Sequence, residues 1–177
     1  YAYAKRGLLV HLDALKAAGQ LDYCYCLPAN IYGAHDNFHP THSHVVPGLV
    51  RRFCEAAQQG LDSVEIWGTG SAKRDFLYID DCVDAMLCIS KAGFSGPINV
   101  ATGELTSIKA LAEEIKRACG FPGDITHDLT KPEGQLERIF DGAKMTGLGW
   151  APAFSFSEGI QRTVDWFNAS EGRFAER

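Results

Sequence analysis

The spacing of apolar residues along the chain alternates between a helical and an extended period. Leucines at positions 8, 9, 12 and 15 recur at helical spacing and Gly19 follows them, which predicts a helix over residues 1–18. The same spacing predicts later helices at residues 45–59, 80–91, 107–118 and 157–168. Short apolar or aromatic runs predict strands at residues 21–27, 63–67, 75–79, 97–101, 123–128 and 137–140. Because strands alternate with helices, we expect an α/β fold.

Side chains able to cap a helix stand before three of these segments. Asp80 or Asp81 is expected to cap the helix that runs to about residue 91, and Thr106 or Ser107 the next one. Asp141 is expected to cap a short turn that ends at residues 147–150.

The segment 28–44 is a long loop in this pattern, rich in Asn, Gly, Pro and His. Loops of such length in a compact domain usually carry function or are mobile. Its histidines are irregularly spaced and no cysteine joins them, so a metal site is not favoured and we expect none. They are His35, His39, His42 and His44. One of them as a proton shuttle, or all of them as loop hydrogen-bonders, are both open interpretations.

Composition narrows the class of partner. The 177 residues carry 22 acidic against 17 basic side chains, a net charge of −5, so a nucleic-acid groove binder is disfavoured. Six cysteines are too few for a disulfide framework and indicate a reducing, cytoplasmic setting. The sequence contains no apolar run long enough for a membrane span and no signal peptide. Tyr1 already falls within a predicted helix, so we interpret the chain as a fragment or a processed piece.

Glycine-rich phosphate-binding loops are absent. No GxGxxG turn follows a strand and no Walker loop occurs, and Gly68 and Gly70 do not lead from a strand into a helix at the required spacing. The chain therefore carries no complete dinucleotide-binding apparatus of its own.

Two groups of residues have a chemistry worth testing. Tyr1 and Lys5 are four residues apart on a predicted helix, so the Lys5 ammonium lies one turn from the Tyr1 phenol. This combination is suited to proton donation. The ordinary alternative is that both side chains simply lie on a solvated helix face. Arg51, Arg52 and Arg74 could bind a phosphorylated ligand, although their spacing alone favours a helix face with ordinary ion pairs. Trp67, just before a GTG turn, offers a flat wall for a sugar or base ring.

Five segments together resemble a known family. They are YAYAK at 1–5, CLPANIYG at 26–33, the run 35–53, the run 65–81 and INVATGE at 98–104. In this order they are similar to the C-terminal half of the extended short-chain dehydrogenases/reductases, which belong to the NAD-dependent epimerase/dehydratases. YxxxK and PxNxYG are general to that superfamily, whereas the runs 35–53 and 65–81 resemble its GDP-L-fucose synthase subgroup. The resemblance spans essentially the whole chain.

The resemblance implies an activity and roles for single residues. It implies NADPH-dependent epimerisation and reduction of GDP-4-keto-6-deoxy-mannose to GDP-L-fucose, with Tyr1 as the proton donor to O4, Lys5 orienting the nicotinamide ribose and His44 as an acid in epimerisation. The implied cofactor contacts are Lys5, Pro28, Ala29, Asn30, Ile31 and His44. The implied substrate contacts are Arg52, Trp67, Arg74 and Lys131. In the loop after Lys131 the family often reads KPDGTPRK, and Glu137 stands here at a basic position.

The resemblance also implies an organisation. Residues 1–35, joined by 75–101, are expected to end a Rossmann domain, and residues 36–177 to form mainly a substrate-binding domain. A homodimer is implied, built through the helix 1–18 or through an unpaired edge of the strand 21–27. A UDP- or dTDP-hexose 4-epimerase or dehydratase and a nucleotide-sugar binding module without turnover are the alternative functions. The isolated chain is expected to be inactive.

Overall fold

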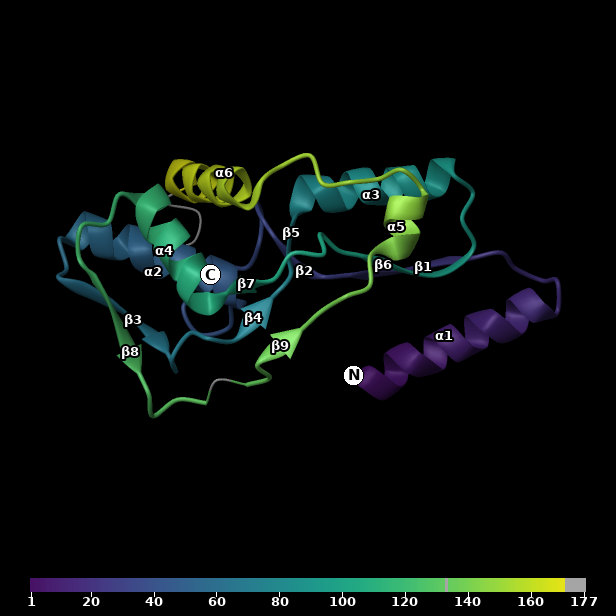
Figure 1. Cartoon of the computed structure of the whole chain (residues 1–177), viewed down its shortest axis with the longest axis horizontal. Coiled ribbons are helices and arrows are strands. Elements are labelled where there is room, and N and C mark those ends of the chain that lie inside the picture. The colour runs from purple at the N-terminus through teal and green to yellow at the C-terminus, as the bar shows by residue number, and fades with distance from the viewer. Residues whose placement is uncertain (133, 171–177) are drawn as a thin grey trace.

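The computed structural model describes residues 1–132 and 134–170. Helices α3 (Ile79–Lys91) and α6 (Phe156–Ala169) lie along one side of the molecule in Figure 1, and the paired strands cross beneath them. The short α5 (Ala143–Gly147) lies beside one strand pair, and α1 (Ala2–Ala17) runs along the opposite side of that pair. None of the helices in the described part of the chain is both long and apolar enough to cross a bilayer.

The strands form short pairs, most of them parallel. β1 (Cys24–Pro28) pairs with β6 (Gly96–Val100), β2 (Asn30–Tyr32) with β5 (Phe76–Tyr78), and β3 (Ser63–Trp67) with β8 (Asp124–Asp128). Parallel strands need helical crossovers between them, which the intervening helices supply. A small sheet has the order β7 (Thr106–Ser107), β4 (Lys73–Arg74), β9 (Glu137–Arg138), in which β4 is antiparallel to β7 and parallel to β9.

Most predicted elements form close to their expected bounds. α2 (Val45–Gln59) and β3 match the prediction, and Ser107 caps α4 (Ile108–Cys119) by accepting a hydrogen bond from the backbone N–H of residue 110 at 3.1 Å. β2 lies inside the segment predicted to be a loop. Three residues next to a proline and a glycine are too few for sequence periodicity to detect, and their pairing with β5 creates the strand.

Two predicted caps are wrong. Tyr78 is the N-cap of α3, and the buried Asp81 instead accepts a hydrogen bond from the backbone N–H of Ala153 at 2.7 Å. Gly142 is the N-cap of α5, although Asp141 still accepts from the N–H of Ala143 at 2.9 Å. In both places tertiary packing draws the chain into a helix one or two residues away from the expected cap.

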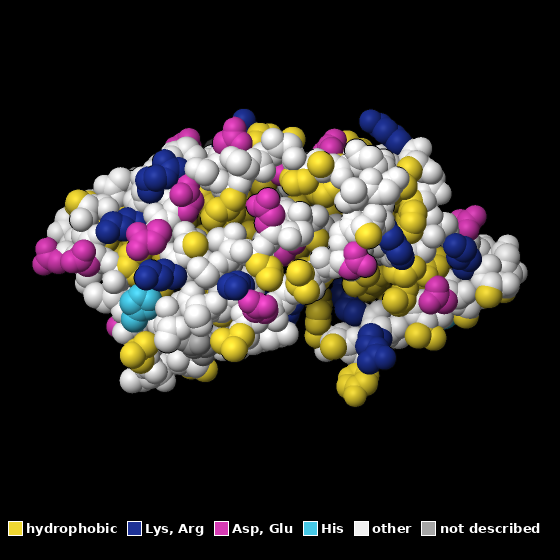
Figure 2. Space-filling view, viewed as in Figure 1, with side chains coloured by type: hydrophobic (Ala, Val, Ile, Leu, Met, Phe, Trp, Pro, Cys, Tyr) yellow, Lys and Arg dark blue, Asp and Glu magenta, His cyan; other side chains and the backbone are white. Residues whose placement is uncertain are grey.

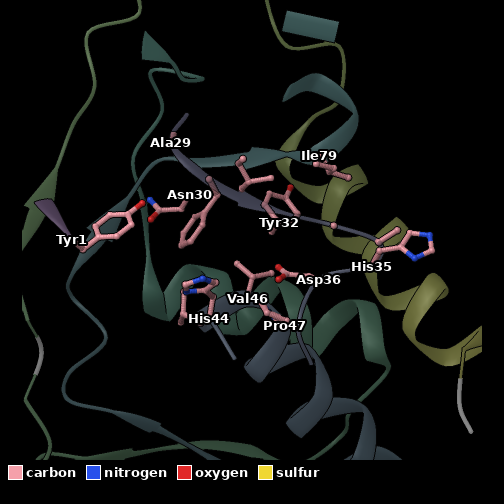
Figure 3. Close-up of a pocket in the computed structure, with 15 residues that line it drawn as sticks. Tyr1, Ala29, Asn30, Tyr32, His35, Asp36, His44, Val46, Pro47 and Ile79 are labelled. Carbon is pink, nitrogen blue, oxygen red and sulfur yellow. The ribbon is translucent and has the colours of Figure 1, made fainter. Parts of the chain in front are cut away.

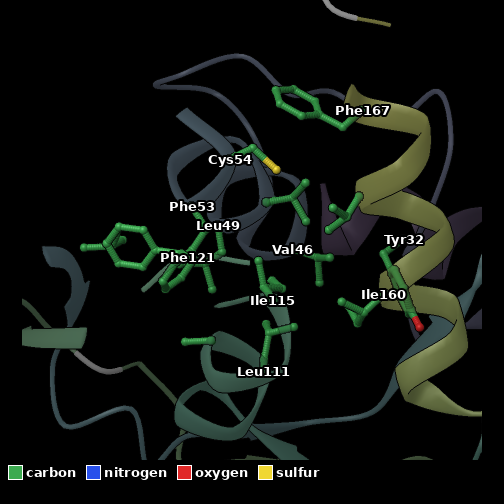
Figure 4. Packing of buried hydrophobic residues seen from close by; sticks show 14 of the residues in the cluster. Tyr32, Val46, Leu49, Phe53, Cys54, Leu111, Ile115, Phe121, Ile160 and Phe167 are labelled. Atoms are coloured by element: carbon green, nitrogen blue, oxygen red, sulfur yellow. The ribbon is translucent and has the colours of Figure 1, made fainter. Parts of the chain in front are cut away.

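Two clusters of buried apolar side chains hold these elements together. The first lies between α2, α4 and α6 and contains Leu49, Phe53, Leu111 and Ile160 (Figure 4). The second packs α3 against β1, β6 and α5 and contains Leu77, Ile98, Met145 and Trp150. The second cluster therefore joins residues from the ranges 1–35 and 75–101 with others near 145–150. The predicted division into a Rossmann part and a substrate part stays a prediction.

Helix α1 contributes no buried side chain to either cluster. Its attachment is polar: the Tyr23 hydroxyl donates to the Asp13 carboxylate, and Lys16 Nζ donates to Ser95 Oγ at 2.8 Å. The bond to Asp13 raises the pKa of Tyr23 to about 12. Tyr3 and Val10 are largely exposed, and Figure 2 shows further apolar side chains on the visible face over α5 and the β1–β6 pair.

Candidate active-site cleft

Two adjoining pockets form a single cleft. The first, of about 780 Å³, is lined by residues that include Tyr1, Ala29, Ile31 and Phe76, and we call it the Tyr1 pocket. The second, of about 640 Å³, is lined by residues that include Arg52, Trp67 and Arg74, and we call it the Trp67 pocket. Asn30, His44 and Val45 line both. The cleft therefore brings together residues that lie as far apart in the sequence as Tyr1 and Pro132.

Tyr1 lies at the open end of the Tyr1 pocket. Its side chain is 98 % exposed, and in Figure 3 the ring carries its hydroxyl toward Asn30. Lys5 does not line the pocket, but its Nζ lies 5.5 Å from the centroid of the Tyr1 ring. The ammonium thus faces the phenol ring one helical turn away, as the four-residue spacing predicts.

Asn30 is fixed where the two pockets meet. Its backbone N–H and its Nδ2 both donate to the carbonyl oxygen of Asp75, at 3.1 and 2.7 Å. The fully buried Asp75 carboxylate accepts in turn from the backbone N–H groups of Thr102 and Gly103, at 3.2 and 2.8 Å, and from the Thr102 hydroxyl at 2.8 Å. The strand ends of β2, β5 and β6 are therefore held together directly behind the cleft.

Gly33 ends the Tyr1 pocket with a close turn. Its φ is +149°, and a Cβ built on it would lie 2.3 Å from Ile79 Cγ2. Only glycine fits both the backbone conformation and the space. This turn directs the segment 34–44 around the pocket.

Among the loop histidines, His44 is the one that lines both pockets. It is the N-cap of α2, and its carbonyl accepts from the N–H of Gly48 at 3.0 Å. Its exposed ring points into the cleft in Figure 3. The N-terminal end of α2, whose unpaired N–H groups favour negative charge, faces the cleft at the same place.

The other three loop histidines contact the protein itself. His35, at a φ of 65°, lines the Tyr1 pocket and packs its ring 4.8 Å from that of Trp166. The His39 and His42 rings stack 4.9 Å apart, and His39 Nδ1 accepts from the N–H of Thr41 at 3.2 Å. Within the described residues no group of three or more His, Cys, Asp and Glu side chains is arranged to hold a metal ion.

The Trp67 pocket combines one aromatic ring with two guanidinium groups. The Trp67 side chain is 60 % exposed, and Arg74, on β4, is partly buried. Arg52 donates to the carbonyl of Glu65 at 2.7 Å, and Arg74 to the carbonyl of Lys73 at 2.7 Å. Burial lowers the pKa of Arg52, and the Glu65 carboxylate acts in the opposite direction. Both groups keep donors for an anionic ligand.

Three predicted positions line neither pocket. Lys131 Nζ sits 5.7 Å from the centroid of the Trp67 ring, and its neighbour Pro132 lines the Trp67 pocket. Pro28 ends β1 and lines neither pocket. Arg51 pairs with Glu55 at 2.6 Å and donates to the carbonyl of Phe38 at 3.1 Å, so its role is in holding the loop to α2.

Sequence reasoning missed Arg138 as a candidate. In the parallel pairing of β4 with β9, Arg138 is the Cα partner of Arg74, and Glu137 is the partner of Lys73, with which it forms an ion pair at 2.9 Å. Neighbouring Cα partners project to the same side of a sheet, so Arg138 adds positive charge next to Arg74. Glu137, which stands where the family has a basic residue, is thus paired with Lys73. Arg138, at the next position, supplies a positive charge instead.

Residues 1–101 match the NAD dependent epimerase/dehydratase family. The chain belongs to this family. It is 40 % identical over 169 residues to the putative GDP-L-fucose synthase 2 of Arabidopsis thaliana, which covers 94 % of this chain and 51 % of that protein. It is 34 % identical over 184 residues to the GDP-L-fucose synthase of Escherichia coli K12, covering 98 % of this chain and 57 % of that protein. The chain thus spans about half the length of the curated relatives it matches.

Solved structures of the family superpose on most of the chain. The NADP-bound GDP-L-fucose synthetase from Naegleria fowleri has a TM-score of 0.86 at 30 % identity, over 96 % of this chain and 55 % of that one. The UDP-glucose 4-epimerase from Thermotoga maritima has a TM-score of 0.82 at 29 % identity, over 96 % and 53 %. These likenesses confirm the predicted fold class, the C-terminal portion of an extended short-chain dehydrogenase/reductase.

Proposed function

We propose that this chain forms the substrate-binding part of an NADPH-dependent enzyme that converts GDP-4-keto-6-deoxy-mannose to GDP-L-fucose. The observation that carries the proposal is the continuity of the cleft: the Tyr1 pocket and the Trp67 pocket meet at Asn30 and His44. A sugar at this junction would have a phenol and an imidazole on its two sides and a diphosphate-binding surface at one end. The relatives named GDP-L-fucose synthase support the same substrate.

The Tyr1 pocket fits a nicotinamide ring better than a polar sugar. Ala29, Ile31 and Val46 give it apolar walls, and the fixed amide of Asn30 offers a polar contact at its edge. The bound cofactor would supply the hydride. The glycine-rich turn that binds the pyrophosphate in dinucleotide-binding domains does not occur in this sequence, which spans about half the length of its relatives.

Two proton-transfer steps are assigned to residues of this chain. As the C4 carbonyl becomes an alcohol, the Tyr1 hydroxyl donates its proton to O4, and the Lys5 ammonium near the ring stabilises the phenolate that remains. During epimerisation a proton leaves a carbon next to the carbonyl, and His44 returns one to the opposite face.

The Trp67 pocket would hold the nucleotide diphosphate. The exposed Trp67 ring can stack on the guanine base, and Arg52 and Arg74 can bind the diphosphate oxygens. Lys131, 5.7 Å from the Trp67 ring, and Arg138, paired in register with Arg74, extend the positive surface. The acidic net charge of the chain is compatible with this site because the basic residues are local.

A homodimer formed through α1 is part of the proposal. The helix exposes Tyr3, Leu8 and Val10 and buries no side chain, so a second copy of α1 could cover it. The free edge of β1, which pairs only with β6 in the described chain, is the other candidate interface. Six free cysteines fit a cytoplasmic protein.

Nucleotide-sugar binding to the chain tests the proposal. A tryptophan fluorescence titration should give binding of GDP-mannose at least about tenfold tighter than that of UDP-glucose or dTDP-glucose, a difference of about 1.4 kcal/mol. Preference for a pyrimidine nucleotide would instead favour a UDP- or dTDP-hexose 4-epimerase, for which the likeness to the Thermotoga maritima enzyme is the supporting observation. Binding that persists in a complete protein without turnover would favour a binding module.

A further inference from the structure

Two cysteines from different helices meet in the first apolar cluster. Cys54 lies on α2, Cys119 is the last residue of α4, and their Sγ atoms are 2.9 Å apart. Cys54 is 3 % exposed and its sulfur is visible within the cluster in Figure 4. Neither residue lines either pocket of the cleft, so the active-site chemistry proposed above does not use them.

The geometry is close to that of a disulfide. An S–S bond is about 2.05 Å long, so the two sulfurs would move together by about 0.9 Å. Cys119 is partly exposed, whereas Cys54 is buried behind it. We therefore expect a reagent from solvent to react first at Cys119, with the Cys54 sulfur already in place to displace the reagent's thiol from it.

A second pair of neighbouring thiols lacks this arrangement. Cys24 and Cys26 lie 3.6 Å apart at their Sγ atoms but stand two residues apart on β1. An extended backbone separates such Cα atoms by about 6.7 Å, near the upper limit that a disulfide spans. This pair therefore serves as an internal comparison.

We propose that Cys54 and Cys119 are a redox-active dithiol that forms a reversible intrachain disulfide on reaction with a small-molecule disulfide such as oxidised glutathione. The Cys119 thiolate attacks one glutathione sulfur and expels the first glutathione as a thiolate. Cys54 then attacks Cys119 Sγ in the mixed disulfide and expels the second. Both cysteine protons pass to the two glutathione thiolates, the protein dithiol is oxidised, and oxidised glutathione is reduced to two glutathione molecules.

The bond would couple oxidation to the substrate side of the cleft. α2 carries Arg52 and α4 begins at Ile108, and both residues line the Trp67 pocket. The hydrogen bond to Cys54 and burial raise the pKa of Cys119, so its thiolate is scarce at neutral pH. Oxidation is therefore slow at pH 7 and becomes faster as the pH rises.

Peptide mapping of the folded 177-residue chain tests this proposal. The reduced chain is incubated with oxidised glutathione, remaining thiols are blocked with N-ethylmaleimide, and a tryptic digest is analysed without reductant. We expect residues 53–73 joined to residues 118–138, with the loss of two hydrogens, and separation of the two peptides by dithiothreitol. The yield at a fixed time should rise at least about tenfold between about pH 7 and about pH 9.

Serine variants assign the linkage. Cys119→Ser and Cys54→Ser should each abolish it, whereas Cys82→Ser, which removes another buried thiol, should leave its yield within about twofold of the parent. Circular dichroism establishes that each variant is folded; if Cys54→Ser is not, Cys119→Ser at the end of α4 decides alone. Separate glutathione adducts without a cross-link, a link from Cys54 to another cysteine, or two thiols that stay reduced while Cys24 or Cys26 oxidises would each overturn the proposal.

Discussion

Asn30 gives both its backbone N–H and its side-chain amide to one acceptor, the carbonyl oxygen of Asp75. Asp75 stands between Arg74 of the Trp67 pocket and Phe76 of the Tyr1 pocket. Its carboxylate is buried and accepts three hydrogen bonds from residues 102–103. One residue behind the cleft therefore connects the walls of both pockets.

Replacing Asp75 by Ala should lower the free energy of unfolding by about 3 kcal/mol. The change removes a fully buried carboxylate and leaves the part-buried N–H groups of Thr102 and Gly103 without their acceptor, and unpaired donors away from water are costly. Urea denaturation followed by circular dichroism measures the loss. Asp84→Ala, at an exposed position of α3, is the control and should change stability by less than about 0.5 kcal/mol. Equal losses for the two variants would contradict this interpretation.

Gly159→Ala should destabilise the protein by about 1–3 kcal/mol, because α6 has no room there. A Cβ at Gly159 would lie 2.2 Å from the Tyr32 hydroxyl oxygen and 3.2 Å from Tyr78 Cδ2. Gly147→Ala, in α5, meets nothing within 4 Å and should instead stabilise by about 0.5 kcal/mol through lower chain entropy in the unfolded state. Thermal or urea unfolding of the pair measures the difference; the same sign for both would be the contrary result.

Trp67→Ala should weaken binding of GDP-mannose by about tenfold, since loss of stacking on a base costs about 1–3 kcal/mol. Isothermal titration calorimetry avoids the loss of the fluorophore. Trp166→Phe is the control, because Trp166 packs on Phe38 at a centroid distance of 5.7 Å and lines neither pocket. Arg74→Lys should also weaken binding, because it loses the forked donor pair. Undiminished affinity in Trp67→Ala would remove the ring from the nucleotide site.

In a protein that joins this chain to a cofactor-binding half, Tyr1→Phe should lower kcat for reduction by about 10²–10⁴-fold while leaving KM nearly unchanged. His44→Ala should stop epimerisation but spare reduction of a substrate that is already epimerised. Steady-state NADPH oxidation with the two substrates measures this split. His42→Ala, two residues away on the same loop, is the matched control and should retain both activities. Equal loss of both activities in His44→Ala would refute the division of roles.

Acid should weaken the start of α6. Hydrogen bonds from Ser155 lower the pKa of Glu158 below its ordinary value of 4.5. A carboxyl whose pKa is lower in the folded state stabilises that state above its unfolded pKa, and this stabilisation is lost as the pH falls through the folded value. Stability should therefore fall below about pH 4.5, and more steeply in the parent than in Ser155→Ala. Urea midpoints measured at successive pH values give the dependence of stability on pH for the parent and for Ser155→Ala. The same dependence in both proteins would contradict the prediction.

Local patterns predicted most strands and every helix of the described residues except α5, where only a short turn was expected, because burial of one face leaves a period in the sequence. β2 and the caps of α3 and α5 were not predicted, because strand pairing and long-range hydrogen bonds determine them. The resemblance supplied residues that the structure gathers at one cleft, such as His44 and Arg74. Arg138 was not predicted as a site residue, because its position depends on the register of β9 against β4, which no local pattern encodes.

Helix α1 has 16 residues and no side chain in the interior. Isolated helices of this length are marginal in water, and tertiary packing normally supplies their stability. The backbone amides of α1 should therefore exchange with deuterium far faster than those of α2, until another surface covers the helix. Tyr1 is the N-cap of α1 and Lys5 lies in its first turn. The phenol and the ammonium would therefore keep their arrangement only when another surface covers the helix, and proton transfer from Tyr1 would then depend on that assembly.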